Sequence, residues 1–293
     1  MEFIPPEVAR YGPQLSGNTT GKKGVLKLGL AHDPVTKKTI VKERYSQVPL
    51  YAQKSMYLEK SLPAMAYMYM MSQGGGILQG DSYTLDISLT AGAVAHLTTQ
   101  GATRIYRMEK GFATQRVDIA AGKDCYLEYM PDQIIPYAGS RFYQKTAIKA
   151  HAEATVVYSE VIAPGRVAMD ESLQYDVCYL RVEATDEDGG SKFTDAAVLE
   201  PKKRDMKARG VLDRDVVGAV YVLAPGRFAG ELYAQVNQAV RGLGGCSVLP
   251  RDSGIAVRML GASASQVRSG AYGVAAVVRK VILGAQFSAM RKG

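Results

Sequence analysis

Acidic side chains set in apolar surroundings are the residues of this sequence with the clearest chemical potential. Glu128 and Glu160 each stand among tyrosines and aliphatic residues, and a carboxylate buried in such surroundings must be paired, hydrated or neutralised. Asp81 and Glu171 lie at or near glycine-containing turns. One interpretation is structural ion pairing, for which the candidate partners are Arg104, Arg107 and Arg166. The other is a wet internal passage that moves ions through oxygen ligands and water.

Histidine and cysteine form no recognisable catalytic or metal-binding motif. The histidines are isolated in the sequence: His32, His96 and His151. The cysteines are odd in number and far apart, which excludes a disulfide framework: Cys125, Cys178 and Cys246. No Gly-x-Ser-x-Gly nucleophile turn occurs. We interpret His96 as a hydrogen-bonded histidine in or beside the core, and we predict a non-enzymatic chain without a tightly bound cofactor.

A glycine-rich stretch before a strand is the most distinctive local feature. Gly74, Gly75 and Gly76 stand in a row and Gly80 follows, which permits a sharp turn and close backbone approach. A phosphate cradle is disfavoured, because Asp81 stands where a Walker loop needs lysine and the next residues predict a strand rather than a helix. The alternative is a tight turn in an all-β domain. We expect at least one left-handed position, at Gly76 or Gly80.

Alternating apolar and polar residues predict many short strands, at the spacing typical of sandwiches and solenoids. The expected strands cover residues 24–30, 39–45, 65–71, 83–89, 94–99, 115–120, 125–130, 142–148, 155–162, 173–183 and 193–199. Further strands are expected at 216–223, 246–249 and 255–260, with helices at 228–241 and 264–282. The fold class is therefore mostly β with two C-terminal α-helices, and α+β overall.

Composition divides the chain into three predicted regions. Residues 1–23 are rich in proline and glycine and predict an irregular N-terminal arm. Residues 24–200 form the predicted β-rich core, and residues 201–293 form a predicted α+β lobe packed on it. No stretch approaches the ~20 apolar residues of a membrane span, and the first residues do not resemble a signal peptide. We therefore expect a cytoplasmic protein without a membrane partner.

The net charge of +8 favours acidic partners and leaves a basic nucleic-acid-binding or nucleotide-binding β protein as the alternative. One basic cluster stands out in the sequence, formed by Lys202, Lys203, Arg204, Lys207 and Arg209. Because it contains no interleaved aromatic residues, we interpret it as a solvated loop and predict no specific nucleic-acid partner.

Four ordered blocks of the sequence resemble the urease accessory proteins called UreD or UreH. The blocks lie at residues 74–81, 96–107, 127–139 and 158–171, and the resemblance covers most of residues 24–200. The signature residues of these blocks are Gly74, Gly75, Gly76, Gly80, Thr98, Thr99, Arg104, Tyr106, Pro131, Gly165 and Arg166. One position departs from the family pattern, because Asp170 replaces a glycine. Aspartate tolerates the left-handed region better than most residues, so we expect this turn to survive.

The resemblance implies a non-catalytic scaffold built from stacked, β-helix-like sheets. It implies a complex with the helical protein UreF, most simply a heterodimer that dimerises further, together with the GTPase UreG and apo-urease. It also implies nickel in transit rather than a resident cofactor. Asp81, Glu128, Glu160 and Glu171 then become a hypothetical nickel path. Between the two interpretations we favour the path for Glu160 and a structural role for Glu128.

Overall fold

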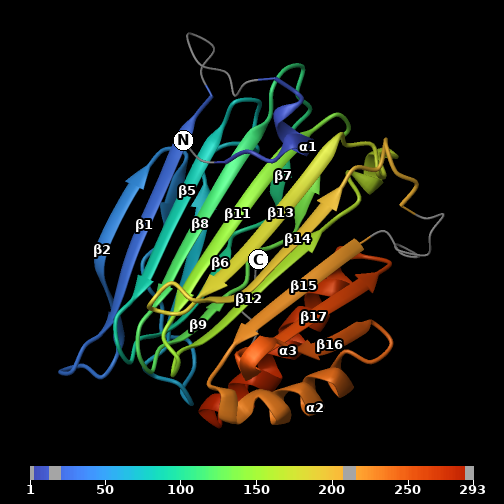
Figure 1. Cartoon of the computed structure of the whole chain (residues 1–293). Helices are drawn as coiled ribbons and strands as arrows, with labels where there is room; N and C mark the ends of the chain where they lie inside the picture. Colours follow the sequence, from blue (N-terminus) through green and yellow to red (C-terminus); the bar gives the residue numbers. More distant parts are fainter. Residues whose placement is uncertain (1–2, 13–20, 207–215, 288–293) are drawn as a thin grey trace.

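Two large β-sheets carry most of the chain (Figure 1). The structure, a computed structural model, describes residues 3–12, 21–206 and 216–287. Sheet A has seven strands in the spatial order β14-β13-β11-β8-β5-β1-β2. Its strands are β1 (Lys23–His32), β2 (Thr39–Gln47), β5 (Ser82–Leu89), β8 (Ala113–Ala121), β11 (Arg141–Ala150), β13 (Val177–Thr185) and β14 (Ser191–Leu199).

Sheet B has ten strands and faces sheet A. Eight of its strands follow the order β16-β17-β15-β12-β9-β6-β4-β3, and β10 links β7 to β12 beside them. Its strands are β3 (Leu50–Ala52), β4 (Ala66–Ser72), β6 (Val94–Thr99), β7 (Thr103–Ile105), β9 (Tyr126–Tyr129), β10 (Ile134–Pro136), β12 (Thr155–Ile162), β15 (Val216–Leu223), β16 (Gly244–Val248) and β17 (Gly254–Gly261).

The chain winds as a stack of coils, because its longer strands alternate between the two sheets from β4 to β13. Neighbouring strands of successive coils are parallel and in register. In sheet A, Leu85 lies beside Val117, and Val117 lies beside Thr146. The predicted mostly β fold of stacked, β-helix-like sheets is therefore confirmed.

Apolar side chains from the facing sheets fill the interior. In β5, Tyr83, Leu85, Ile87 and Leu89 are buried while Ser88 is exposed, which is the period-two pattern of a strand with one solvated face. All eight residues of β12 are buried. A strand becomes buried throughout when both faces of its sheet are covered, so the central strands of sheet B must have a second cover.

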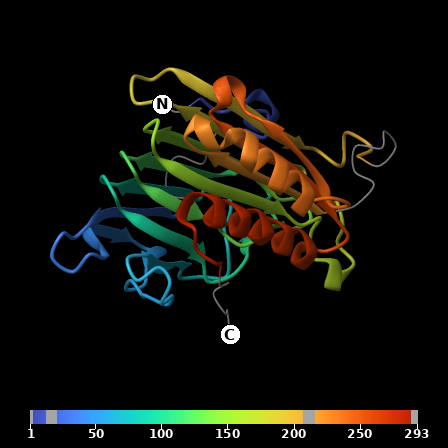
Figure 2. The ribbon, with the colours of Figure 1, turned by 90° about the horizontal axis from the view of Figure 1, so that it is seen from below.

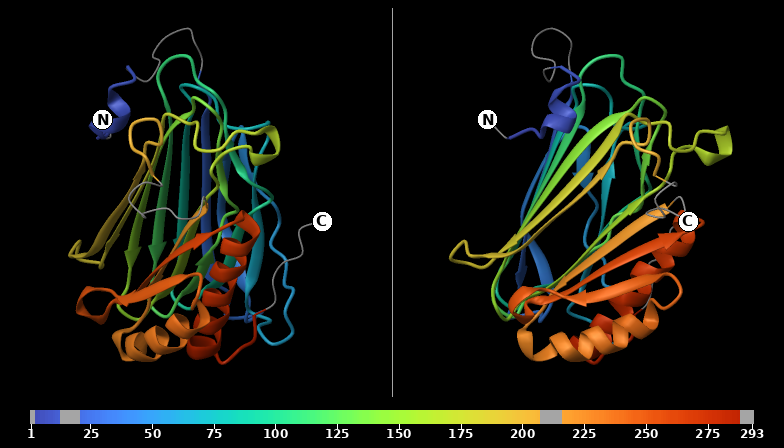
Figure 3. Two further views of the ribbon diagram at one scale, coloured as in Figure 1. Left: turned by 90° about the vertical axis from the view of Figure 1, so that its right-hand side faces the viewer. Right: turned by 45° about the vertical axis from the view of Figure 1, so that its right-hand side comes forward.

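That second cover is a pair of C-terminal helices, which lie against the outer face of sheet B (Figures 2 and 3). The helices are α2 (Ala229–Ala239) and α3 (Ala264–Leu283). Val267 and Val274 of α3 join one buried cluster with Val220 of β15. The hydroxyl of Ser263 caps the start of α3, and Gly284 ends it in the left-handed conformation. The prediction of two C-terminal helices is confirmed.

The C-terminal residues continue sheet B, because β15 pairs antiparallel with β12 and β17 pairs with β15. At the other terminus, Pro6–Ala9 form the short helix α1. Val8 of α1 is fully buried against Phe112 and Tyr143 on the outer face of sheet A. The division of the chain into arm, core and lobe stays a prediction. No helix among the described residues is long and apolar enough to cross a membrane.

One expected strand is shorter than predicted. The pattern at residues 173–183 predicted a continuous strand, but β13 begins at Val177. Leu173 has a φ of +55°, a left-handed conformation that no strand accommodates. Apolar residues before Val177 therefore belong to the preceding turn, in which Tyr175 is buried for packing rather than for strand pairing.

The glycine-rich stretch forms a hinge whose glycines are needed for two different reasons. Gly74 and Gly80 have positive φ values of 140° and 77°. Gly76 does not, but a Cβ atom on it would lie 2.5 Å from the backbone oxygen of Arg104. The hinge therefore lets two backbone segments touch where Ile77 pairs with Ile105. The expected left-handed position is confirmed at Gly80, whereas Gly76 serves close approach.

The unusual aspartate is accommodated as expected. Asp170 closes the 3-10 turn Val167–Met169 with φ 56° and ψ 24°, in the left-handed region. Its conformation is thus the one that glycine adopts most readily and that aspartate tolerates.

The close approach at Gly76 leads to a stability prediction. Gly76→Ala should lower the free energy of unfolding by roughly 2 kcal/mol or more, because backbone must move to admit the methyl group. Chemical denaturation measures this loss. Gly101→Ala is the matched control, since a Cβ there meets nothing within 4 Å and the change should stay within about 0.5 kcal/mol. Equal stabilities for the two variants would contradict the proposed backbone contact.

Candidate functional site

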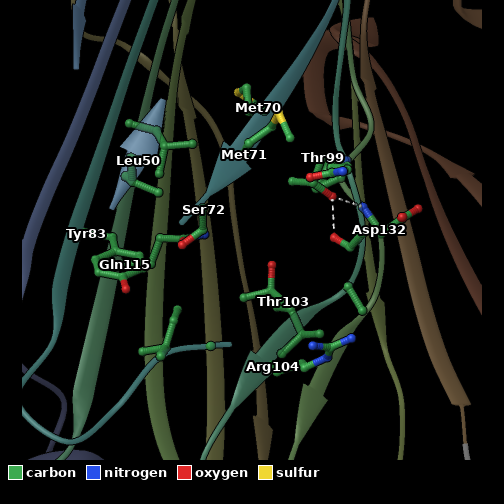
Figure 4. A pocket seen from close by; sticks show the side chains of 18 of the residues that line it. Leu50, Met70, Met71, Ser72, Tyr83, Thr99, Thr103, Arg104, Gln115 and Asp132 are labelled. Atoms are coloured by element: carbon green, nitrogen blue, oxygen red, sulfur yellow. Dashed lines mark hydrogen bonds between the residues drawn. The ribbon is translucent and has the colours of Figure 1, made fainter. Parts of the chain in front are cut away.

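A cavity of about 380 Å³ lies between the two sheets, next to the glycine hinge. Hinge residues 74–77 and the segment 99–104 form one part of its wall. Deeper residues come from the inner faces of both sheets: Tyr83, Gln115, Tyr129, Gln144, Tyr158 and Glu160. Figure 4 shows Tyr83 and Gln115 on one side of the space and Thr99 and Asp132 on the other, with Ser72 and Thr103 between them. The cavity is therefore lined by apolar and polar side chains together, and its deeper part carries amide, hydroxyl and carboxyl groups.

Glu160 is the buried acid of this cavity. Glu160 lies on β12 and is only 6% exposed. The hydroxyl of Tyr158 donates to Glu160 Oε1 over 2.6 Å, and the Gln144 amide donates over 3.2 Å. Burial raises the pKa of Glu160 to about 7, against the hydrogen bonds that oppose this rise. A carboxyl group that titrates near neutrality can exchange a proton for a metal cation.

Polar side chains continue from Glu160 across the interior as a hydrogen-bonded row. Gln115 donates to Gln144 over 2.8 Å, and Gln144 donates to Tyr158 over 3.0 Å. Thr146 and Tyr158 share a further hydrogen bond of 3.0 Å. The row places amide and hydroxyl oxygens where a closely packed core would place apolar atoms, so it provides oxygen ligands without histidine or cysteine.

Asp132 is a cavity-lining acid that the sequence analysis did not single out. It is 5% exposed, and its backbone N–H donates to Thr99 Oγ1 over 2.9 Å. Its carboxylate accepts a 3.2 Å hydrogen bond from Arg268 of α3. Its position directly after Pro131, at the end of a strand in a signature block, could have identified Asp132 from the sequence.

Glu128 faces away from the cavity, toward α3. Its side chain is fully buried, and Arg279 donates to both of its oxygens over 2.9 and 2.6 Å. Arg279 also donates to Glu59 over 2.6 Å. Burial works to raise the pKa of Glu128, but hydrogen bonds from His96 and Arg279 outweigh it and hold the pKa below its usual value.

The Glu128 geometry supports the structural interpretation and corrects its partner. The candidates Arg104, Arg107 and Arg166 were wrong for Glu128, because the true partner stands 151 residues later in the chain. The interpretation of His96 is confirmed: this histidine is 1% exposed and contacts Glu128 at 2.6 Å through Nδ1.

The other two acids of the hypothetical path have hydrogen-bond or ion-pair partners of their own. Asp81 accepts hydrogen bonds from the backbone N–H groups of Lys22 and Leu78 and from the hydroxyl of Tyr83. Glu171 pairs with Arg166, one of the expected partners, with an Nε to Oε2 distance of 2.8 Å. The four acids therefore do not converge. Only Glu160 lines the cavity, and Asp81 borders it through Tyr83.

The signature residues gather at the cavity wall and at the neighbouring corner of the coil. Gly74, Gly75, Gly76, Thr99, Arg104 and Pro131 line the cavity. At the corner, Tyr106 packs edge-on against Tyr137, and the Arg166 guanidinium lies 4.2 Å from the centre of the Tyr137 ring. Thr98 donates to the backbone of Met130 over 2.6 Å. Gly165 has a φ of +144°, and a Cβ there would lie 2.5 Å from the backbone oxygen of Glu171.

The basic cluster is engaged within the chain as far as it is described. Lys202 pairs with Asp176 over 2.7 Å. Lys203 and Arg204 both approach Glu200, at 3.8 and 3.9 Å. Lys207 and Arg209 lie outside the described residues. Internal pairing of three of the cations disfavours a nucleic-acid footprint.

The fold and the cavity together define a β-solenoid whose apolar interior contains a row of hydrogen-bonded polar side chains beside the cavity. Among the described residues, no group of three histidine, cysteine, aspartate or glutamate side chains is arranged to hold a metal ion. None of the three histidines lines the cavity.

Comparison with known proteins gives this scaffold a family. A family model described as UreD urease accessory protein matches residues 22–293. A urease accessory protein UreD of Cenarchaeum symbiosum (strain A) is 41% identical over 284 residues, covering 95% of this chain and 99% of the relative. The UreD of Photorhabdus laumondii subsp. laumondii is 37% identical, covering 95% and 89%. A UreD 2 of Brucella suis biovar 1 is 34% identical, covering 95% of each. The chain belongs to the UreD family of urease accessory proteins.

The buried cluster around Glu128 leads to a stability prediction. Glu128→Gln should cost about 3 kcal/mol or more of unfolding free energy, because it leaves the buried Arg279 short of negative charge. Denaturant titration at neutral pH measures the change. Asp118→Asn is the control: it removes an exposed ion pair with Arg116 and should cost no more than about 1 kcal/mol. A Glu128→Gln protein as stable as this control would rule out the structural role.

Replacement of Glu160 should have the opposite effect on the free energy of unfolding. Its folded-state pKa lies above the ordinary value of 4.5, so the folded protein keeps a proton that the unfolded chain has lost, and stability falls as pH rises from about 4.5 to about 7. Glu160→Gln should remove this fall and stabilise the protein above pH 7, by on the order of 3 kcal/mol. Parallel pH profiles of unfolding free energy for wild type and variant would refute the assignment.

Proposed function

We propose that this chain is a non-catalytic scaffold for urease maturation that helps to deliver nickel to apo-urease. It acts in the cytoplasm in a complex with UreF and UreG, as a heterodimer with UreF that dimerises further. Its relatives carry the name urease accessory protein, which supports a role beside urease rather than in urea hydrolysis. The proposal assigns nickel as cargo in transit.

The observation that carries this proposal is the buried Glu160 carboxyl at the cavity. Isolated buried acids weaken a fold unless something offsets their burial, and Glu160 has hydrogen bonds but no direct ion pair among the described residues. Residues retained at a cost in stability are typical of functional positions. A passing divalent cation would provide the positive charge that Glu160 lacks.

The donor set of the cavity suits passage rather than storage. Nickel binds most strongly to imidazole and thiolate, and oxygen ligands hold it less tightly. The wall offers the Glu160 carboxyl group and the side-chain oxygens of Gln115, Gln144 and Tyr158. Conduction requires sites that are attractive enough to admit an ion and weak enough to release it.

Within the hypothetical path, the four acids then take different roles. Glu160 is the acid that the ion contacts on the path. Asp81 holds the cavity-lining residue Tyr83 in place by accepting a hydrogen bond from its hydroxyl. Glu128 and Glu171 have structural roles, because each forms an ion pair with an arginine. The glycine hinge shapes the cavity wall beside them.

Activation of urease at limiting nickel tests the proposal. Urease co-produced with UreF, UreG and this chain should gain nickel and activity, whereas omission of this chain should leave normal amounts of urease protein with little nickel. Glu160→Gln should slow nickel transfer by about tenfold or more, while the complex still assembles. Nickel content of purified urease, activity and co-purification are the measurements.

The matched control is Glu231→Gln, which makes the same chemical change on the exposed face of α2. It should activate urease like wild type. Full activation without this chain would overturn the scaffold role. Unchanged transfer by Glu160→Gln in an intact complex would overturn only the path through Glu160.

A further inference from the structure

A short turn at one corner of the coil presents two exposed apolar side chains. Val167 and Met169 belong to the 3-10 turn Val167–Met169 and are 62% and 66% exposed. Figure 3 shows this turn, in yellow-green, standing out from the two sheets. Single exposed apolar residues are common on protein surfaces, but two of them on one projecting turn make a compact apolar contact surface.

The loop that carries this turn is held in one conformation. Its base is closed by a hydrogen bond of 2.7 Å from the Leu173 N–H to the Pro164 carbonyl. Arg166, directly before the turn, pairs with Glu171 with an Nε to Oε2 distance of 2.8 Å. Its guanidinium also lies 4.2 Å from the centre of the Tyr137 ring. A preorganised surface of this kind loses little conformational entropy when a partner binds.

Two exposed arginines without a charged partner lie on the same corner. Within residues 3–12, 21–206 and 216–287, neither Arg104 nor Arg107 forms an ion pair or a side-chain hydrogen bond. Other arginines of this region, such as Arg141 and Arg166, have carboxylate oxygens 2.7 and 2.8 Å away. The charges of Arg104 and Arg107 are therefore available to an external acid.

One segment of backbone joins the two arginines to the apolar turn. The Tyr137 N–H donates to the carbonyl of Ile105, which follows Arg104 in β7, over 2.9 Å. A Cβ added to Gly139 would lie 3.5 Å from Cγ of Arg107. Between them, Ala138 donates its N–H to Glu171 of the projecting loop over 3.3 Å. The cations and the apolar turn thus contact the same three residues, 137–139.

We propose that Arg104, Arg107, Val167 and Met169 form a docking surface, here called the docking corner, for a partner protein that presents an apolar pocket with carboxylates at its rim. This inference rests on the proposed role in a urease maturation complex and adds the surface and the chemistry of one contact in it. The two apolar side chains fill the pocket, and the guanidinium groups donate to the carboxylates in the fork geometry that suits them.

The composition of the docking corner favours such a protein over the other occupants that two cations could attract. Nucleic-acid interfaces are more polar than protein–protein interfaces, and phosphate groups give no reason for the exposure of Val167 and Met169. A second copy of this chain is disfavoured as well. In a two-fold contact the same surface meets itself, so arginines would face arginines.

Binding of the full-length chain to purified UreF, UreG and apo-urease, offered singly and together, tests the inference. The double changes Arg104→Glu/Arg107→Glu and Val167→Ser/Met169→Ser should each weaken binding to the same partner by about tenfold or more. Rising ionic strength should weaken binding of the wild type. Surface plasmon resonance measures the dissociation constants, and thermal unfolding verifies that each variant is folded. The single changes Arg107→Glu and Met169→Ser replace any double variant that does not fold.

Matched controls make the same chemical changes elsewhere on the surface. Lys42→Glu/Arg44→Glu reverses two exposed charges on the edge strand β2. Val35→Ser changes an apolar residue that is 86% exposed. Both controls should bind every partner with the wild-type affinity.

The outcomes separate this inference from the proposed function. If both double variants bind every partner and activate urease like wild type, the proposed function stands and the docking corner is refuted. If the wild type binds none of the three proteins, the proposed function fails and this inference fails with it. A loss of partner binding after only one of the two double changes would also refute the combined surface.

Two further measurements identify the wrong occupant. If an RNA oligonucleotide binds the wild type but not Arg104→Glu/Arg107→Glu, while partner binding is unchanged, the arginines belong to a nucleic-acid site. If analytical ultracentrifugation shows a wild-type dimer that the double variants abolish without loss of partner binding, the occupant is a second copy of this chain. Either result overturns the inference.

Discussion

The structure depends on the covering of sheet B on both faces. Sheet A closes one face and the helices α2 and α3 close the other, so β9 and β12 bury every residue whether it points inward or outward. In such a strand, side chains still alternate between the two faces of the sheet, but this alternation no longer separates apolar from polar positions. It separates two buried environments instead. Polar residues in these strands therefore face either the interior between the sheets or the helices.

Glu128 and Glu160 show the consequence of this geometry. They lie on the neighbouring strands β9 and β12, where Glu128 is in register with Val157, and alternation directs Glu160 to the opposite face. The same chemical group is therefore neutralised in two different ways when it is buried. Glu128 is neutralised by the fixed cation Arg279, whereas burial raises the pKa of Glu160 to about 7, so that a proton neutralises it at lower pH. One arrangement anchors a helix, and the other leaves a site that can change its charge.

Local signals in the sequence predicted the strands and the C-terminal helices, and the resemblance to the UreD family implied the stacked architecture. They also singled out Glu160 as an acid without solvent exposure and Asp170 as a residue for a left-handed turn. They did not give the partner of Glu128, because Arg279 is distant in sequence and its helix has to be docked before the pair exists. The row of Gln115, Gln144 and Tyr158 was equally hidden, since it arises from register between successive coils. No single strand contains it.

The two faces of sheet B also differ in where the family signature lies. Gly76 has to be glycine because two backbones touch there, and the touching segments form the wall of the cavity. The polar row behind that wall weakens the interior, since its amides and hydroxyls replace apolar packing. On the far side of sheet B, the Arg279 cluster joins α3 to β9 through charges fully removed from water. A buried ion pair of this kind adds little to net stability but strongly penalises any arrangement that breaks it. It therefore fixes the helix and the sheet in one register.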